Sequence, residues 1–495
     1  MQVSNSVSAT VGALIVVGIR WLDRLIALAS TVILARLLAP ADFGIIAMAS
    51  LVIGLIDVLL DLGVSITLVQ NKHATQHDFD AAWTLRLIQS ALATVVVFLA
   101  AYPAARYFHD PRVCPVVQAL ALSVLLAGFE NIGIVSFQKK MEFGLEFRFF
   151  FAKRISSFLI TIVLAWYLHS YWALVAGTVA GRVIAVVLSY VMHPMRPRLS
   201  WVNMKPMLSF SCWNLLRGIS GYLAENLHRL LVGRRESTAL MGSYTLASDI
   251  SAMPSIELLA PLNRVLFPMF VAAKEDAHEL KRIFMLAIAV QALVGVPAGA
   301  GLALVAPEMV LALLGERWLS TVPFIQIMAG INIVSAVSTS GAYVLLALGR
   351  AKIIAIHSWG QVLMFVLLAM LLMPGAGAMA IAGIRLGVAA AGLLTLIYLL
   401  HLVQPAWRLS DVMSGIWRPC VASMVMTLVL LSLPAMHHLP VMLLLLLKTI
   451  LGASVYCAAM LALWLLSGRQ DGAESYLLGK VGTLMKGSTN LIWKR

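Results

Sequence analysis

The sequence carries little charge. Charged residues make up 12% of its 495 residues, whereas soluble domains carry about 25%. Hydrophobic residues make up 61%, and no gap between the apolar runs is long enough for a soluble domain of roughly 50 residues. These proportions exclude a soluble globular protein and indicate a polytopic membrane protein.

Cysteine and the common catalytic motifs are also scarce. The four cysteines are scattered without a pairing or metal-ligand spacing, so we interpret them as packing residues. The chain lacks a Walker A motif, a dinucleotide fingerprint, a nucleophile elbow and a metalloprotease motif. We therefore expect no catalytic residues, no metal and no cofactor, and the energy for any transport must come from gradients or from the substrate itself.

What the chain has instead is apolar runs. Fourteen of them, each near the 20 residues that a bilayer needs, predict an all-α integral membrane protein with about 14 transmembrane helices. The N-terminus lacks a basic region and a small-residue cleavage site, so we expect the first span to be retained.

The distribution of basic residues predicts the orientation. They concentrate in the loops on one side, among them Lys139, Lys140 and Arg148. The positive-inside rule then places these loops and both termini in the cytoplasm. This topology accounts for most of the net charge of +14, and we expect no nucleic-acid partner.

A weak internal repeat divides the chain. A shift of 198 residues places Arg36 on Arg234, Gly44 on Gly242 and Ala49 on Ala247. Because the shift relates the first span to the seventh, the copies have the same orientation and form two pseudo-symmetric lobes of six helices. We expect an N-lobe at 1–206, a C-lobe at 207–403, two additional spans within 404–470, and a cytoplasmic tail at 471–495. The apolar spacing of the tail fits an amphipathic helix on the membrane surface, and a solvated tail is the alternative.

The first span carries charges near its middle. Arg20, Asp23 and Arg24 lie within the stretch Val11–Gly44, at spacings that place them on one face of a helix. Each charge at the centre of a spanning helix costs roughly 2.5–3.5 kcal/mol. One side of this helix should therefore face protein or water.

Charges recur in the first two spans of each repeat, which indicates a shared central cavity. Its arginines suit a phosphate group because the planar guanidinium binds two oxygens and stays charged. Its acids are candidates for ion coupling or for charge balance. The alternative is that many of these charges only neutralise a partner, as the spacing of Glu225 and Arg229 allows. The candidate cavity arginines are Arg20, Arg24, Arg217, Arg229 and Arg264, and the candidate acids are Asp23, Asp57, Asp61, Glu225, Asp249 and Glu257.

Three pairs of glycines four residues apart predict close helix packing. The pairs are Gly177 with Gly181, Gly295 with Gly299, and Gly383 with Gly387.

The end of the first span and the second span resemble a known family of membrane proteins. The stretch that carries this resemblance is ILARLLAPADFGIIAMA, followed by DLGVSITLVQ. It resembles the polysaccharide transporter (Wzx-type) family of lipid-linked oligosaccharide flippases, within the multidrug/oligosaccharidyl-lipid/polysaccharide exporter superfamily.

The resemblance implies a two-lobe transporter that exposes a central cavity alternately to each side of the bacterial inner membrane. The implied cargo is an undecaprenyl-diphosphate-linked oligosaccharide, moved to the periplasmic leaflet for exopolysaccharide, capsule or O-antigen assembly. Membrane lipid, a polysaccharide polymerase and a chain-length regulator are the implied partners. Cavity residues that would attract the diphosphate and sugar are Arg20, Arg24, Arg217 and Arg264.

Two other functions fit a polytopic membrane protein less well. A multidrug or organic-cation antiporter of the same superfamily should have an acidic cavity and usually twelve spans. A membrane polysaccharide polymerase or ligase needs a catalytic loop on the outer face, where every predicted loop is short. We therefore expect a transporter and not an enzyme.

Overall fold

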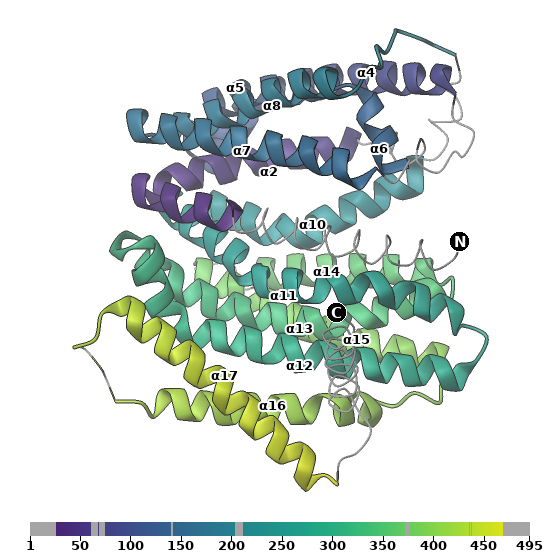
Figure 1. Cartoon of the computed structure of the whole chain (residues 1–495), viewed down its shortest axis with the longest axis vertical. Helices are drawn as coiled ribbons and strands as arrows, with labels where there is room; N and C mark the ends of the chain where they lie inside the picture. The colour runs from purple at the N-terminus through teal and green to yellow at the C-terminus, as the bar shows by residue number, and fades with distance from the viewer. Residues whose placement is uncertain are drawn as a thin grey trace, which may run out of the picture. The chain divides into compact units, whose positions relative to one another are not determined.

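The computed structural model describes residues 26–60, 68, 75–139, 142–202, 211–371, 377–434, 436 and 438–468. The side chains of some helical residues, including Arg217, Glu257 and Arg264, lie outside this description. Within the described residues the regular structure is entirely helical (Figure 1). The predicted all-α membrane fold is therefore confirmed.

The described helices follow one another along the chain in this order. The N-terminal ones are Ile26–Leu37, α2 (Pro40–Leu60), α4 (Gln76–Phe108), α5 (Val113–Gly128), η1 (Ile132–Ile134), α6 (Val135–Lys139), α7 (Phe143–Leu168), α8 (Trp172–Met192), α10 (Ser211–Arg235) and α11 (Thr238–Ala272). The C-terminal ones are α12 (Ala277–Met309), η2 (Val310–Leu314), η3 (Glu316–Thr321), α13 (Val322–Ala347), α14 (Ala351–Leu371), α15 (Ala378–Val403), α16 (Leu409–Leu431) and α17 (Val441–Leu466).

Ten helices in the described residues are long and apolar enough to cross a membrane. Two shorter apolar helices, Ile26–Leu37 and α5, coincide with two further predicted spans. The two remaining predicted spans, the seventh and eighth, coincide with α10 and α11, which are long and carry several polar residues. Each predicted span thus matches a helix, while the number that crosses the membrane stays a prediction.

The chain divides into two compact units, Met1–Thr245 and Leu246–Arg495. The division falls within α11, so the N-terminal unit includes α10 and the first turns of α11. The predicted lobe boundary at 206/207 rests on the sequence repeat and stays a prediction.

Small residues bring helices of the N-terminal unit close together. In that unit α4 packs against α5, α7 packs against α8, and α5 also contacts α8. A Cβ atom on Gly177 would collide with the side chain of Thr161, and one on Gly181 would collide with Ser157. The predicted packing role of this glycine pair in α8 is confirmed.

In the C-terminal unit, α12 is the helix around which the others gather. It contacts α13, α16 and α17, and the Tyr456 hydroxyl of α17 donates a hydrogen bond to the Leu293 carbonyl at 2.8 Å. Lys448 of α17, which is isolated in the sequence, forms an ion pair with Glu308 of α12 at 2.5 Å. The two additional C-terminal helices are thus fastened by both apolar and charged contacts.

Glycine packing differs between α12 and α15. Cβ atoms on Gly295 and Gly299 would collide with Ala336 and Ile333 of α13, as predicted. The prediction is wrong for α15, because Cβ atoms on Gly383 and Gly387 would meet no described heavy atom within 4 Å. These two glycines are exposed and face away from the neighbouring helices of their unit.

We predict that Gly177→Val destabilises the protein, because the added carbons must displace the α7 side chains that touch this position. Overpacking of this kind costs about 1–3 kcal/mol, which should lower the melting temperature in detergent by several degrees. Gly387→Val adds the same atoms at an open position of α15. An equal loss of stability in both variants would refute this account of the α7–α8 contact.

Candidate functional site

The structure describes part of the predicted cavity set. Asp57 on α2, Glu225 on α10 and Asp249 on α11 are exposed, and Arg229 on α10 is half-buried. Of these, Asp249 belongs to the C-terminal unit. Arg20, Asp23, Arg24 and Asp61 lie outside the described residues, and so do the side chains of Arg217, Glu257 and Arg264.

Three of the predicted residues gather around Tyr222, which the sequence reasoning missed. Arg229, Asp57 and Glu225 all lie within electrostatic range of the Tyr222 hydroxyl. That hydroxyl donates a hydrogen bond of 2.6 Å to the carbonyl oxygen of Leu51 on α2. Tyr222 therefore joins α10 to α2 at the point where their charged residues meet.

The local sequence explains this arrangement. Tyr222, Glu225 and Arg229 are three and four residues apart, which places them on one face of α10. Gly54 on α2 leaves room for the Tyr222 ring, which a Cβ atom would contact at 3.0 Å. The α2–α10 face thus combines one guanidinium with two carboxylates, a mixture that can hold an anionic group or a cation beside it.

The first turns of α2 and α11 approach each other more closely than side chains allow. A Cβ atom on Gly44 would collide with the carbonyl oxygen of Thr238. Conversely, a Cβ atom on Gly242 would collide with the carbonyl oxygen of Pro40. The shift of 198 residues carries Gly44 to Gly242 and Pro40 to Thr238. This reciprocal contact, the α2–α11 crossing, has the form expected of a local twofold axis between the repeats.

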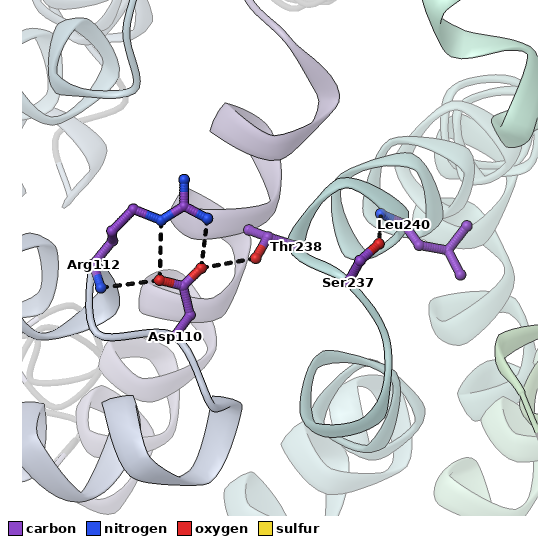
Figure 2. A network of polar contacts seen from close by, with 5 residues as sticks. All are labelled: Asp110, Arg112, Ser237, Thr238 and Leu240. Atoms are coloured by element: carbon purple, nitrogen blue, oxygen red, sulfur yellow. Dashed lines mark hydrogen bonds and ion pairs between the residues drawn. The ribbon is translucent and has the colours of Figure 1, made fainter.

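A buried carboxylate fastens the crossing to the α4–α5 loop (Figure 2). Asp110 accepts two hydrogen bonds from the Arg112 guanidinium, Nε to Oδ1 at 3.0 Å and Nη2 to Oδ2 at 2.7 Å. The Arg112 backbone amide adds a third bond at 3.0 Å. The Thr238 hydroxyl, at the start of α11, donates to Asp110 Oδ2 at 2.8 Å. We call these three residues the Asp110 clamp.

The charges of the Asp110 clamp are stable near neutral pH. Burial opposes ionisation of Asp110, but the hydrogen bonds from Arg112 and Thr238 outweigh it, so the pKa of this carboxyl lies below its ordinary value of 3.8. The hydrogen bond to Asp110 raises the pKa of Arg112. The Asp110 clamp therefore gives its full stabilisation of the folded state at any pH above the ordinary carboxyl pKa. This stabilisation is lost only as the pH falls through the lowered pKa of Asp110.

Further contacts tie the end of α4 to the end of α10. The Tyr107 hydroxyl donates to the Leu230 carbonyl at 3.4 Å, and the Arg234 guanidinium lies 5.1 Å from the Tyr107 ring centroid. A Cβ atom on Gly233 would contact the ring of Phe108 at 2.9 Å. This end of the helices, which the loop charges predict to be the outer side, is closely packed.

Comparison with known proteins identifies the family. A model of the polysaccharide biosynthesis protein family matches residues 33–323, which is more than half of the chain. The chain belongs to this family. The resemblance to polysaccharide transporters that the first two spans suggested is therefore confirmed.

Two curated relatives in the family match at low identity. The lipopolysaccharide biosynthesis protein WzxC of Escherichia coli K12 is 25% identical over 329 residues, covering 65% of this chain and 66% of the relative. The teichuronic acid biosynthesis protein TuaB of Bacillus subtilis 168 is 24% identical over 312 residues, covering 62% and 65%. The matched region thus spans about two thirds of the length of these relatives.

A solved structure shares the fold. The structure of the lipid II flippase MurJ in its inward closed conformation matches with a TM-score of 0.71. The match covers 91% of this chain and 99% of MurJ, at 10% sequence identity. At this identity the likeness establishes the fold of this family member and nothing about its substrate.

We predict that Thr238→Val loosens the α2–α11 crossing, because valine keeps the shape of threonine but cannot bond to Asp110. Met48 is fully buried and lies one turn from Gly44 on the same face of α2. A Met48→Cys reporter should therefore react faster with a membrane-impermeant maleimide. Loss of a hydrogen bond to a charged group corresponds to about a tenfold faster rate.

Thr245→Val is the matched control, since in the described part of the chain that hydroxyl contacts the sulfur of Met241 within α11 and not Asp110. Gly242→Ala provides an independent variant, because its methyl group must push against the Pro40 carbonyl. Gly221→Ala adds a methyl group where no described atom lies within 4 Å. Unchanged labelling in both test variants would show that the crossing does not depend on these contacts.

Proposed function

We propose that this family member is a flippase for an undecaprenyl-diphosphate-linked oligosaccharide. It moves the repeat unit from the cytoplasmic to the periplasmic leaflet for exopolysaccharide, capsule or O-antigen assembly. The observation that carries the proposal is the family match over residues 33–323, which includes the charged α2–α10 face. The names of WzxC and TuaB, both polysaccharide biosynthesis proteins, support the same substrate class.

The physical problem is the diphosphate. Its charges cannot cross about 30 Å of hydrocarbon without compensation. Arginine side chains inside a cavity replace part of the lost hydration with paired, charge-assisted hydrogen bonds. The polyprenyl chain stays in the bilayer while the sugar and diphosphate pass between the helices.

The proposal assigns roles to the charged residues of the predicted cavity. Arginines bind the diphosphate and the sugar, and the acids balance their charge or couple transport to an ion. On the described α2–α10 face, Arg229 is the anion-binding group, while Asp57 and Glu225 limit how tightly the anion is held. The full arginine set is Arg20, Arg24, Arg217, Arg229 and Arg264, and the acids are Asp23, Asp57, Asp61, Glu225, Asp249 and Glu257.

Alternating access gives the α2–α11 crossing its role. While Gly44 and Gly242 hold the two helices in contact, the predicted outer side is shut. Release of the substrate to the periplasm requires these helices to separate, so the Asp110 clamp must break in each cycle. Because a hydrogen bond contributes only about 1–3 kcal/mol in this setting, the clamp can hold the closed state without trapping it.

The proposed function includes a location and a membrane orientation. The chain is a multi-pass protein of the bacterial inner membrane with both termini in the cytoplasm, as its loop charges predict. It transports and does not catalyse. A polysaccharide polymerase and a chain-length regulator act on the repeat units after they reach the periplasmic leaflet.

We predict that Arg24→Ala and Arg229→Gln each abolish polysaccharide export in a host that depends on this chain. Losing a charge-assisted contact to the diphosphate should lower transport at least about tenfold. Lipid-linked repeat units should build up on the cytoplasmic side, measured by extraction and mass spectrometry, while the protein still inserts in the membrane.

The control is Lys274→Gln, which removes the same charge from an exposed side chain that pairs with its neighbour Glu275 at 3.6 Å. Export at the normal level in both arginine variants would rule out the basic cavity. Longer glycan chains made by purified protein without leaflet transfer would instead favour a polymerase.

A further inference from the structure

A second group of charges lies inside the N-terminal unit, on helices other than the predicted cavity helices. Arg86 on α4 donates to the Glu130 carboxylate, just after α5, with Nη2 and Oε2 3.1 Å apart. Lys153 on α7 lies within electrostatic range of Glu130, Arg182 and Arg86. Arg182 belongs to α8. We call these four residues the Arg86 cluster.

The Arg86 cluster lies deep within its helices. Arg182 is midway along α8, about 15 Å from either end of the helix, which is farther than an arginine side chain extends. Lys153 is a similar distance from the start of α7. Both side chains are half-buried, and Arg86 is 28% exposed. The charged groups of Arg182 and Lys153 therefore cannot extend past the ends of their helices. Because the side chains are only half-buried, a ligand can still reach the cluster.

Three cations and one carboxylate leave the Arg86 cluster with two excess positive charges. Glu130 is the one carboxylate within electrostatic range of Lys153 in the described part of the chain. The Phe149 ring, 5.9 Å from the Lys153 ammonium, compensates only weakly. Because an unbalanced charge at bilayer depth costs roughly 2.5–3.5 kcal/mol, a bound anion would stabilise the Arg86 cluster.

The fold itself does not require these charges. Helices of the same order in the C-terminal unit, α12 to α15, carry a single charge in their central turns, Arg385, among the described residues. Where α4 and α5 are joined by Arg86 and Glu130, α12 and α13 are joined by a hydrogen bond from the Ser340 hydroxyl to Gln291 Oε1 at 2.6 Å. Equivalent packing is thus achieved with neutral groups.

We propose that the Arg86 cluster binds the phosphate group of an anionic lipid. Arg86, oriented by Glu130, and Arg182 supply planar forks that match phosphate oxygens, and Lys153 adds a compact point charge. Arg86 and Lys153 lie in the halves of α4 and α7 that begin at predicted cytoplasmic loops, and basic groups between helices on that side favour anionic headgroups. The phosphate belongs either to a membrane phospholipid or to a lipid-linked diphosphate. The site does not rest on the proposed flippase activity, except that its cytoplasmic position uses the predicted orientation.

The test measures lipid binding to the purified full chain by native mass spectrometry. The chain should retain phosphatidylglycerol over phosphatidylcholine. Lys153→Gln and Arg182→Gln should each weaken phosphatidylglycerol binding about fivefold. Lys274→Gln, on the exposed loop before α12, should leave binding unchanged. Equal binding of the two lipids, or equal binding by the parent and both variants, would overturn the proposal.

Glu130→Gln separates a ligand site from a folding effect. It removes the opposing charge but keeps an oxygen that Arg86 can bond, so phosphatidylglycerol binding should become tighter. A variant that merely damaged the fold would bind less. Weaker binding by Glu130→Gln would therefore contradict the proposed site.

Competition with undecaprenyl diphosphate identifies the source of the phosphate. If undecaprenyl diphosphate displaces phosphatidylglycerol from the parent, but does not displace the phosphatidylglycerol that Lys153→Gln still binds, the site is assigned to the lipid-linked diphosphate. Retention of phosphatidylglycerol assigns it to a membrane headgroup, and both results keep the phosphate site. Lipid binding is measured on the purified chain and export in cells, so failure of the phosphate site and failure of the proposed flippase activity are recognised by separate measurements.

Discussion

The cost of leaving a charge in hydrocarbon governs where this chain can place its polar groups. Helices α12 to α17 of the C-terminal unit carry few charges in their central turns, and Lys448 of α17 is paired with Glu308 of α12. The N-terminal unit instead concentrates charge on two surfaces, the α2–α10 face and the Arg86 cluster. Charged helices are retained in a membrane protein where the charge has a ligand or a water-filled space to face. We therefore propose a functional role for both surfaces.

Glycine provides the second constraint, because it sets how closely helices approach. Gly44 and Gly242 let two backbones touch at the α2–α11 crossing, where any side chain would hold them apart. This contact is small and is supported by a few hydrogen bonds to Asp110. Because this contact depends on the close approach of two backbones and on few hydrogen bonds, the two helices can separate at a low cost in free energy. α2, one of the two crossing helices, also carries Asp57, which is among the predicted cavity residues.

The sequence predicts the helices well because hydrocarbon permits few alternatives. Every predicted span coincides with a helix, and Asp57, Glu225 and Arg229 do lie around one point. Tyr222 and the Asp110 clamp were missed because their partners are far away in the chain, Leu51 and Thr238, and no local spacing reveals them. The repeat that aligns Gly44 with Gly242 held the signal for the crossing. The prediction of close packing at the glycine pair of α15 was wrong because spacing shows that two residues share a helix face, but not which neighbour that face contacts.

The most direct test of the central claim is leaflet transfer by the purified chain in sealed vesicles. A fluorescent undecaprenyl-diphosphate sugar is placed in one leaflet, and its appearance in the other is followed with an impermeant quencher. The account predicts transfer that requires the protein and falls at least about tenfold in Arg229→Gln. Transfer no faster than in protein-free vesicles, or equally fast in that variant, would contradict it.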